Sequence, residues 1–105
     1  MYTYQQQTKD VLDYDVIMDD WFAEIPGDDI QSVTITVTSV TGLDLALVVG
    51  PVPHPEYVLM GATPTRFKVW IGGGTEFEDY IVTCLVKTEQ DRTFEVEFKI
   101  KVRNK

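Results

Sequence analysis

The sequence predicts an all-β domain, an antiparallel sandwich of about seven short strands. Three observations predict it. Apolar and polar residues alternate along most segments, turn-forming residues separate the segments, and no stretch has the length and spacing of an amphipathic helix. The length of 105 residues fits one domain with a core of its own.

Four segments show clear alternation, which places one face of each strand in the core and the other in water. These are residues 12–18, 32–38, 66–71 and 94–102. Residues 43–49 and 80–87 are apolar on both faces, as expected of central strands. The predicted core consists of Val33, Ile35, Val37, Leu45, Val69, Val82, Cys84, Phe94, Val96, Phe98 and Ile100.

The connections and the N-terminus have a different composition. Residues 88–92 are short and polar and predict a hairpin between the last two strands. The proline-rich segment 50–55 predicts an excursion over the surface. Residues 1–8, with three consecutive glutamines, predict an extended N-terminal arm that is mobile in the isolated chain, while residues 9–105 form the domain.

Tyr80 narrows the type of sandwich. It opens the penultimate strand directly after a glycine-containing corner, as in the tyrosine corner of immunoglobulin-like and fibronectin III-like domains. Its hydroxyl is expected to bond the backbone of that corner. Cys84, four residues later, has no partner for a disulfide and is interpreted as a small core residue.

Charge and composition exclude several classes of function. Seventeen acidic and nine basic residues give a net charge of −8, which argues against binding nucleic acid or an anionic membrane. One cysteine excludes an internal disulfide and a multi-cysteine zinc site. No basic-apolar leader and no apolar run of about 20 residues is present, so the chain is expected to be made and first folded in a cytoplasm.

The charges are unevenly distributed. Residues 1–30 contain eight acids and one base, whereas residues 85–105 contain four acids and six bases. The two regions could pair within one molecule or between copies, or they could be solvated strand faces.

Residues suited to catalysis or metal binding are few. His54, the one histidine, lies between two prolines in the predicted surface excursion, far from a buried Cys84. The sequence therefore predicts no enzyme and no catalytic residue. Calcium could use carboxylates, but the acids here lack EF-hand spacing and mark wet strand faces, so no metal or cofactor is predicted. These acids are Asp10, Asp13, Asp15, Asp19, Asp20, Asp28 and Asp29.

Aromatic residues are more numerous than the predicted inward faces accommodate. Exposed aromatic rings indicate protein interfaces or sugar-stacking platforms, although ordinary core packing is the alternative. The residues in question are Tyr2, Tyr4, Trp21, Phe22, Tyr57, Trp70 and Phe77.

Several motifs in order resemble the tailed-phage fiber–tail adaptor family, small virion proteins with an immunoglobulin-like sandwich. The similarity covers roughly residues 9–103, whereas residues 1–8 and the long segment Gly50–Pro64 depart from the family pattern. The motifs are Lys9–Asp15, Asp20–Phe22, Gly27–Ser32, Val69–Thr75, Tyr80–Cys84 and Asp91–Thr93.

The resemblance implies a non-enzymatic structural protein of the virion tail. It would join fibers or spikes to the tail tube or the head–tail connector, in several copies around the tail axis, without nucleic acid or membrane. Assembly would take place in the host cytoplasm. The alternative is a carbohydrate-binding or adhesion module of the same fold on the virion surface, with Tyr57, Trp70 or Phe77 as stacking platforms.

The partner-binding residues are predicted in the two segments that lack core periodicity. The arm and the segment 50–64 both carry apolar side chains, which are typical interface anchors when exposed. The predicted contact residues are Tyr2, Tyr4, Tyr57, Val58, Leu59 and Met60.

Overall fold

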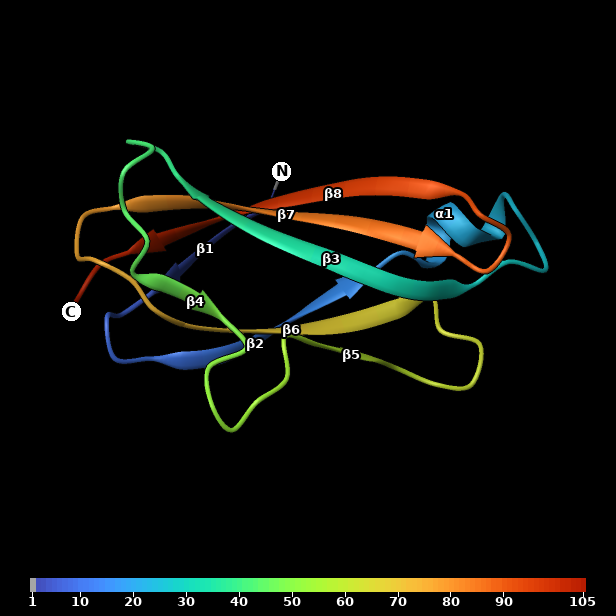
Figure 1. The fold of residues 1–105 in the computed structure, drawn as a ribbon, viewed down its shortest axis with the longest axis horizontal. Coiled ribbons are helices and arrows are strands. Elements are labelled where there is room, and N and C mark those ends of the chain that lie inside the picture. Colours follow the sequence, from blue (N-terminus) through green and yellow to red (C-terminus); the bar gives the residue numbers. More distant parts are fainter. Residues whose placement is uncertain (1) are drawn as a thin grey trace.

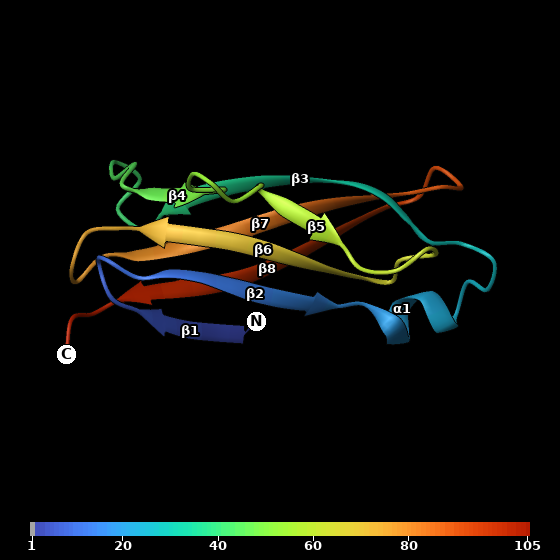
Figure 2. The same cartoon turned by 90° about the horizontal axis from the view of Figure 1, so that it is seen from below.

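Two β-sheets pack face to face in the computed structural model, which describes residues 2–105 (Figures 1 and 2). The molecule is elongated, with extents of 43 × 26 × 20 Å. The elements are β1 (Tyr2–Gln6), β2 (Val11–Ile17), α1 (Asp19–Ala23), β3 (Ile30–Ser39), β4 (Leu47–Val49), β5 (Tyr57–Leu59), β6 (Arg66–Gly73), β7 (Asp79–Thr88) and β8 (Thr93–Val102).

The first sheet has the strand order β1-β8-β7-β3. β7 and β8 form the hairpin predicted from the sequence, with Val82 opposite Phe98. β3 lies antiparallel to β7, with Ile35 opposite Cys84. β1 adds to the outer edge of β8 in parallel orientation, so this sheet is not purely antiparallel.

In the second sheet, β4 and β5 form two halves of one interrupted edge strand. β2 pairs with one side of β6 along its whole length, and both short strands pair with the other side. The last residue of β4 pairs with Ile71 of β6, and the first residue of β5 pairs with Val69 of β6. The chain therefore leaves the sheet opposite Trp70, which lies between these two positions. Gly50 permits this departure, because its φ is +67° and a Cβ there would lie 2.8 Å from the Glu56 backbone nitrogen.

The core lies between the two sheets and confirms most of the predicted residues. Val33, Val69, Val82, Cys84, Phe98 and Ile100 are buried, and Ile35, Val37, Phe94 and Val96 are partly buried against them. Leu45 is the wrong prediction, because it is 90% exposed. Residues 43–46 form a loop instead of a central strand, in which the Asp44 carboxylate accepts a hydrogen bond from the Ala46 N–H at 2.8 Å. The strand begins only at Leu47.

One short helix was not expected from the sequence. α1 is a single turn, too short for its periodicity to stand out. The turn allows Met18 and Phe22, four residues apart, to point together into the core. Trp21 is left on the outside, where its ring meets the edge of Phe94 with centroids 5.0 Å apart.

The N-terminal segment is extended, as expected. It is not a free arm, because β1 forms the edge strand of the first sheet. The Tyr14 hydroxyl on β2 donates to Gln6 Oε1 on β1 at 2.6 Å, which connects the two sheets. The buried Gln6 amide donates to the carbonyl oxygens of Asp10 and Ile71 at 3.2 and 3.3 Å. The Tyr4 ring lies 4.8 Å from that of Tyr14. These contacts order the segment without a partner molecule.

Candidate interaction surfaces

The structure places the six predicted contact residues at two separate edges. Tyr2, which is 78% exposed, and the half-buried Tyr4 lie on β1 at the edge of the first sheet. Tyr57 and Leu59 turn inward and pack against the core, whereas Val58 between them is 40% exposed. Met60 follows β5 and is half-buried. Figure 2 shows that β1 and β5 belong to different edges of the sandwich, so the two groups do not form one site.

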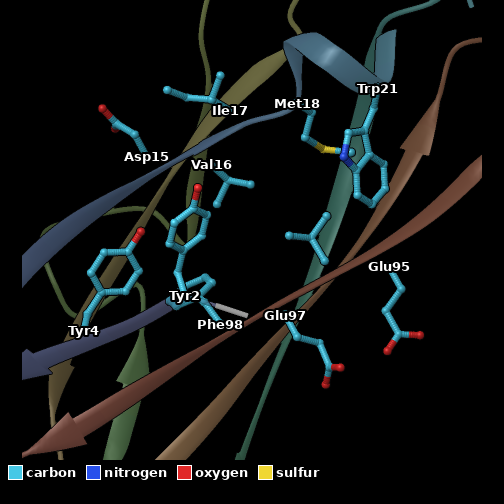
Figure 3. A pocket seen from close by; sticks show the side chains of 11 residues that line it. Tyr2, Tyr4, Asp15, Val16, Ile17, Met18, Trp21, Glu95, Glu97 and Phe98 are labelled. Atoms are coloured by element: carbon cyan, nitrogen blue, oxygen red, sulfur yellow. The ribbon is translucent and has the colours of Figure 1, made fainter. Parts of the chain in front are cut away.

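A groove of about 530 Å³ opens beside Tyr2 and Tyr4. We call it the edge groove; it runs between β8 and β1 on one side and β2 and α1 on the other (Figure 3). Its floor is apolar and its ends carry the rings of Tyr2 and Trp21. The floor residues are Val16, Met18, Val96 and Phe98, and Ile17 lies on the rim.

The rim of the edge groove is acidic. Asp15, Glu95 and Glu97 line it, and none of its described lining residues is Lys, Arg or His. Asp15 lies 3.5 Å from the Lys68 ammonium, and Glu97 accepts a hydrogen bond from the Thr83 hydroxyl at 3.1 Å. The Glu95 carboxylate has no hydrogen-bond or ion-pair partner within residues 2–105. The groove therefore offers apolar anchoring together with an uncompensated negative charge.

The long loop after β4 is fastened to the second sheet. The rings of His54 and Trp70 stack with centroids 3.7 Å apart and an angle of 7° between their planes. Both ends of the loop bond the Trp70 backbone: Gly50 N–H donates to the Trp70 carbonyl, and Trp70 N–H donates to Glu56. His54 thus covers one face of the Trp70 ring, which removes this face as a sugar-stacking platform.

Cys84 is not available to His54 as a nucleophile. Cys84 is buried between the sheets, and burial raises the pKa of its thiol to about 12, so the thiol stays protonated at neutral pH. Within the described residues, no cluster of three potential ligands that could hold a metal ion is found. No helix in the described part of the chain is long and apolar enough to cross a bilayer.

Most of the aspartates of the N-terminal region pair with basic residues of the same molecule. Asp19 binds Arg66 at 2.6 Å, Asp13 pairs with Lys68, and Asp28 binds Arg92. Hydrogen bonds from Arg66 and then Thr65 lower the pKa of Asp19. The sequence left open whether the acidic N-terminal and basic C-terminal regions pair within one molecule. Asp28 and Arg92 form such a pair, with the guanidinium nitrogen 2.8 Å from the carboxylate oxygen.

A second surface was missed by the sequence analysis. The loops 40–46 and 74–78 lie together at one end of the sandwich, and we call them the loop end (Figure 1). Leu43 is 89% exposed and Phe77 is 76% exposed, beside the exposed Leu45. The apolar run 43–49 predicts a central strand, which hides the exposure of Leu43 and Leu45. The sequence marks Phe77 as an aromatic residue in excess of the core and as a possible sugar-stacking platform, but not as part of a surface with Leu43 and Leu45.

The backbone holds the apolar residues of the loop end outward. Thr41 Oγ1 donates to Glu78 Oε2 at 3.0 Å, and Gly74 N–H donates to the Ala46 carbonyl at 3.0 Å, so the two loops brace each other. Phe77 has a φ of 70°, a left-handed backbone conformation that residues other than glycine rarely adopt. Such strain in an exposed aromatic residue points to a functional surface.

A comparison with family models matches residues 6–101, most of the chain, to the family described as podophage GP4 fiber-tail adaptor protein gp77. A comparison with curated proteins found no match. The matched region contains β2 to β7, all of β8 but its last residue, the loop end and most of the edge groove, whereas β1 lies outside it except for Gln6. The chain therefore belongs to the podophage fiber–tail adaptor family, and it is a non-enzymatic structural protein of the virion tail.

Proposed function

We propose that this adaptor is a rigid spacer that binds the tail through the edge groove and the fiber through the loop end. One observation carries the proposal: exposed apolar side chains gather at two separate places on a single sandwich. Tyr2 and Trp21 flank the first place, and Leu43 and Phe77 mark the second. An adaptor holds two partners at once, and apolar anchors of this kind supply most of the binding energy of protein interfaces.

The edge groove is assigned to the tail because it lies along the long side of the molecule. A surface on the long side can bury more area than a loop end, which suits the attachment that must bear the fiber. Tyr2 and Tyr4 contribute aromatic rings to this surface. Several copies around the tail axis would add up individually weak contacts by avidity.

The segment Tyr57–Met60 is proposed as a smaller element of fiber attachment. Val58 is the residue that faces outward, whereas Tyr57 and Leu59 anchor the segment to the core. Met60 follows with partial exposure. The loop that precedes this segment is fixed on Trp70, so the segment is presented in one conformation.

The fold is proposed to be immunoglobulin-like or fibronectin III-like. In support, β3, β7 and β8 have the order and direction of the C, F and G strands of such domains, and β2, β6 and the interrupted β4–β5 correspond to B, E and D. In this scheme residues 9–105 are the domain and residues 1–8 are an N-terminal addition, from which β1 pairs with the last strand.

The test uses phage particles that carry variant adaptors. Leu43→Ser with Phe77→Ser is expected to leave the adaptor on the tail and to remove fibers. Tyr2→Ser with Trp21→Ser is expected to remove the adaptor itself. Leu85→Ser, an exposed apolar position on the outer face of β7, is the control and should change neither. Loss of the same partner in both double variants would contradict separate attachment surfaces.

A further inference from the structure

We propose that the edge groove accepts an extended segment of a tail protein bearing Lys or Arg, which adds as a strand to the free edge of β8. The inference rests on the proposed function, because it takes the groove as the tail-side surface. It adds the mode of binding and the chemistry of the partner.

Within residues 2–105, half of the outer edge of β8 has no neighbouring strand. β8 runs from Thr93 to Val102, but β1 pairs only with the part from Phe98 onward. The stretch from Thr93 to Glu97 therefore presents an open sheet edge, in line with the start of β1. Open edges of this kind pair with added strands unless they are covered.

The pairing of β7 and β8 identifies the backbone groups that face the open edge. At the two ends of the hairpin, Val102 N–H donates to the Glu78 carbonyl and Thr88 N–H donates to the Arg92 carbonyl. Between these ends, every even-numbered residue of β8 lies opposite an even-numbered residue of β7, so the even-numbered pairs are the hydrogen-bonded ones. In an antiparallel pair, the intervening residues direct their N–H and C=O groups to the other side. The N–H and C=O groups of Thr93 and Glu95 and the N–H of Glu97 thus face the edge groove, while the Glu97 carbonyl pairs with the start of β1.

The groove floor matches the side chains of an added strand. Neighbouring strands lie about 4.8 Å apart and alternate their side chains between the two faces. A segment beside β8 would direct every second side chain inward over Val96, between the rings of Tyr2 and Trp21. Figure 3 shows these two rings on either side of the opening. Inward positions of the partner are therefore apolar.

The acidic rim of the edge groove indicates which residues occupy the outward positions of the added strand. It also argues against a second copy of this chain as the occupant. The outward positions of an added strand would lie beside Glu95 and Glu97, with Asp15 across the groove, so Lys or Arg complements them. A second copy also carries a net charge of −8 and would meet this rim with like charge. The occupant is accordingly a different protein, with alternating apolar and basic residues.

A proline substitution tests the backbone pairing. Glu95→Pro removes an N–H that faces the groove and leaves the bonds to β7 in place, whereas Glu95→Ala removes only the carboxylate. In assembled particles, adaptor occupancy on the tail is expected to fall at least tenfold for Glu95→Pro and less than threefold for Glu95→Ala. Equal occupancy for the two variants, with Glu95→Pro folded by circular dichroism, would overturn strand addition.

A charge reversal keeps the test decisive if the proline variant does not fold. Glu95→Lys with Glu97→Lys is expected to lower occupancy at least tenfold, whereas Glu89→Lys, an exposed acid on the β7–β8 turn, is the control and should not. Unchanged occupancy of the double variant would overturn the inference that the partner segment is basic. Fiber attachment by the loop-end variant is measured in parallel, so the proposed function can hold when the strand inference fails.

A cross-link identifies the occupant directly. Benzoylphenylalanine in place of Trp21 is irradiated in intact particles, and the linked peptide is sequenced by mass spectrometry. An extended segment of another virion protein with Lys or Arg at alternate positions supports the inference. A link to a second copy, to a helical or acidic segment, or to nothing while the adaptor remains on the tail overturns it. Benzoylphenylalanine at Thr36, on the opposite edge strand, is the position control.

Discussion

The Tyr80 hydroxyl donates a hydrogen bond to Asp44 Oδ1 at 2.8 Å while it accepts one from the Thr75 N–H at 2.9 Å. The second bond confirms the predicted contact with the corner backbone. The first joins that corner to the loop 40–46, so one buried hydroxyl connects both loops of the loop end. The side chain of Thr75, the Ala46 N–H and Tyr80 lower the pKa of Asp44, which keeps it ionised as an acceptor.

Tyr80→Phe is expected to destabilise the protein by ~1–3 kcal/mol, because it removes one neutral hydrogen bond and one to a carboxylate. Urea unfolding at neutral pH measures this change. Tyr2→Phe, at an exposed hydroxyl, is the matched control and should leave the unfolding free energy unchanged. A Tyr80→Phe variant as stable as the original chain would show that water replaces both bonds without cost.

Phe98→Ala and Leu45→Ala compare a confirmed core residue with a wrongly predicted one. Phe98 is buried between the sheets, so its truncation is expected to cost ~3–5 kcal/mol. Leu45 is exposed in the loop end, and its truncation should cost less than ~0.5 kcal/mol. A similar loss for both variants in urea unfolding would mean that the loop 40–46 packs against the sandwich.

Acid is expected to destabilise the fold through Asp28. Burial raises the pKa of this carboxyl, but hydrogen bonds outweigh burial and hold the pKa below its ordinary value. The donors are Thr88, Arg92 and the N–H groups of Gln90 and Asp29. Since the folded pKa is the lower one, the unfolded chain binds more protons as the pH falls. The contribution is complete above the unfolded pKa and is lost as the pH drops through the folded pKa.

Urea midpoints between pH 7 and pH 3 measure this dependence. They should be flat above about pH 5 and fall below it. Asp28→Asn should show a smaller fall, while Asp20→Asn, an exposed acid at which no such bonds form within the described residues, should follow the original curve. If Asp28→Asn keeps the full acid sensitivity, other carboxylates such as Asp19 or Asp44 dominate.

Alternation in the sequence was sufficient to predict the long strands β3 and β8. One face of each strand meets the opposite sheet and the other meets water, so burial follows the strand period. The tyrosine corner was also predictable, because it needs only a tyrosine after a turn. Leu43 and Leu45 show where an apolar run misleads. Apolar residues also occur in a loop, and here the bonds of Asp44 bend the chain before the strand begins.

The remaining differences depend on contacts between distant residues. Gln6 is polar and lies in a polar N-terminal stretch, and its burial follows from partners on β2 and β6 that no local pattern reveals. The edge groove exists because β1 is shorter than β8 and begins partway along it. Tyr2 and Tyr4 could be predicted as candidate contact residues, but their neighbour Trp21 comes from α1, a single turn without a periodic signal.

Tyr57→Ala with Leu59→Ala tests whether β5 is mainly structural. Both side chains pack against the core, so the double variant is expected to lose ~2–4 kcal/mol of stability in urea. Val58→Ser, between them, should remain as stable as the original chain and weaken fiber attachment alone. A double variant of unchanged stability that loses fibers would instead make Tyr57 and Leu59 direct contacts.

Stepwise truncation separates the structural role of β1 from its role in docking. Removing residues 2–3 leaves Gln6 and the Tyr4 ring in place, so the melting temperature should stay within about 3 °C. Removing residues 2–8 deletes Gln6, leaves the buried Tyr14 hydroxyl without its acceptor, and uncovers the edge of β8. This longer truncation should lower the melting temperature by about 10 °C or more.

Gln6→Ala in the full chain isolates the polar contacts within this effect. It removes the acceptor of Tyr14 and the donors to Asp10 and Ile71, but it keeps the strand. If this variant accounts for most of the loss, the bonds between the sheets stabilise β1; if it melts like the original chain, packing of Tyr4 on Phe98 does so. Tail docking is then measured for the shorter truncation, which remains folded. Because that truncation lacks the Tyr2 ring, reduced adaptor occupancy on the tail would reflect a lost contact, whereas normal occupancy would show that Tyr2 is dispensable for docking.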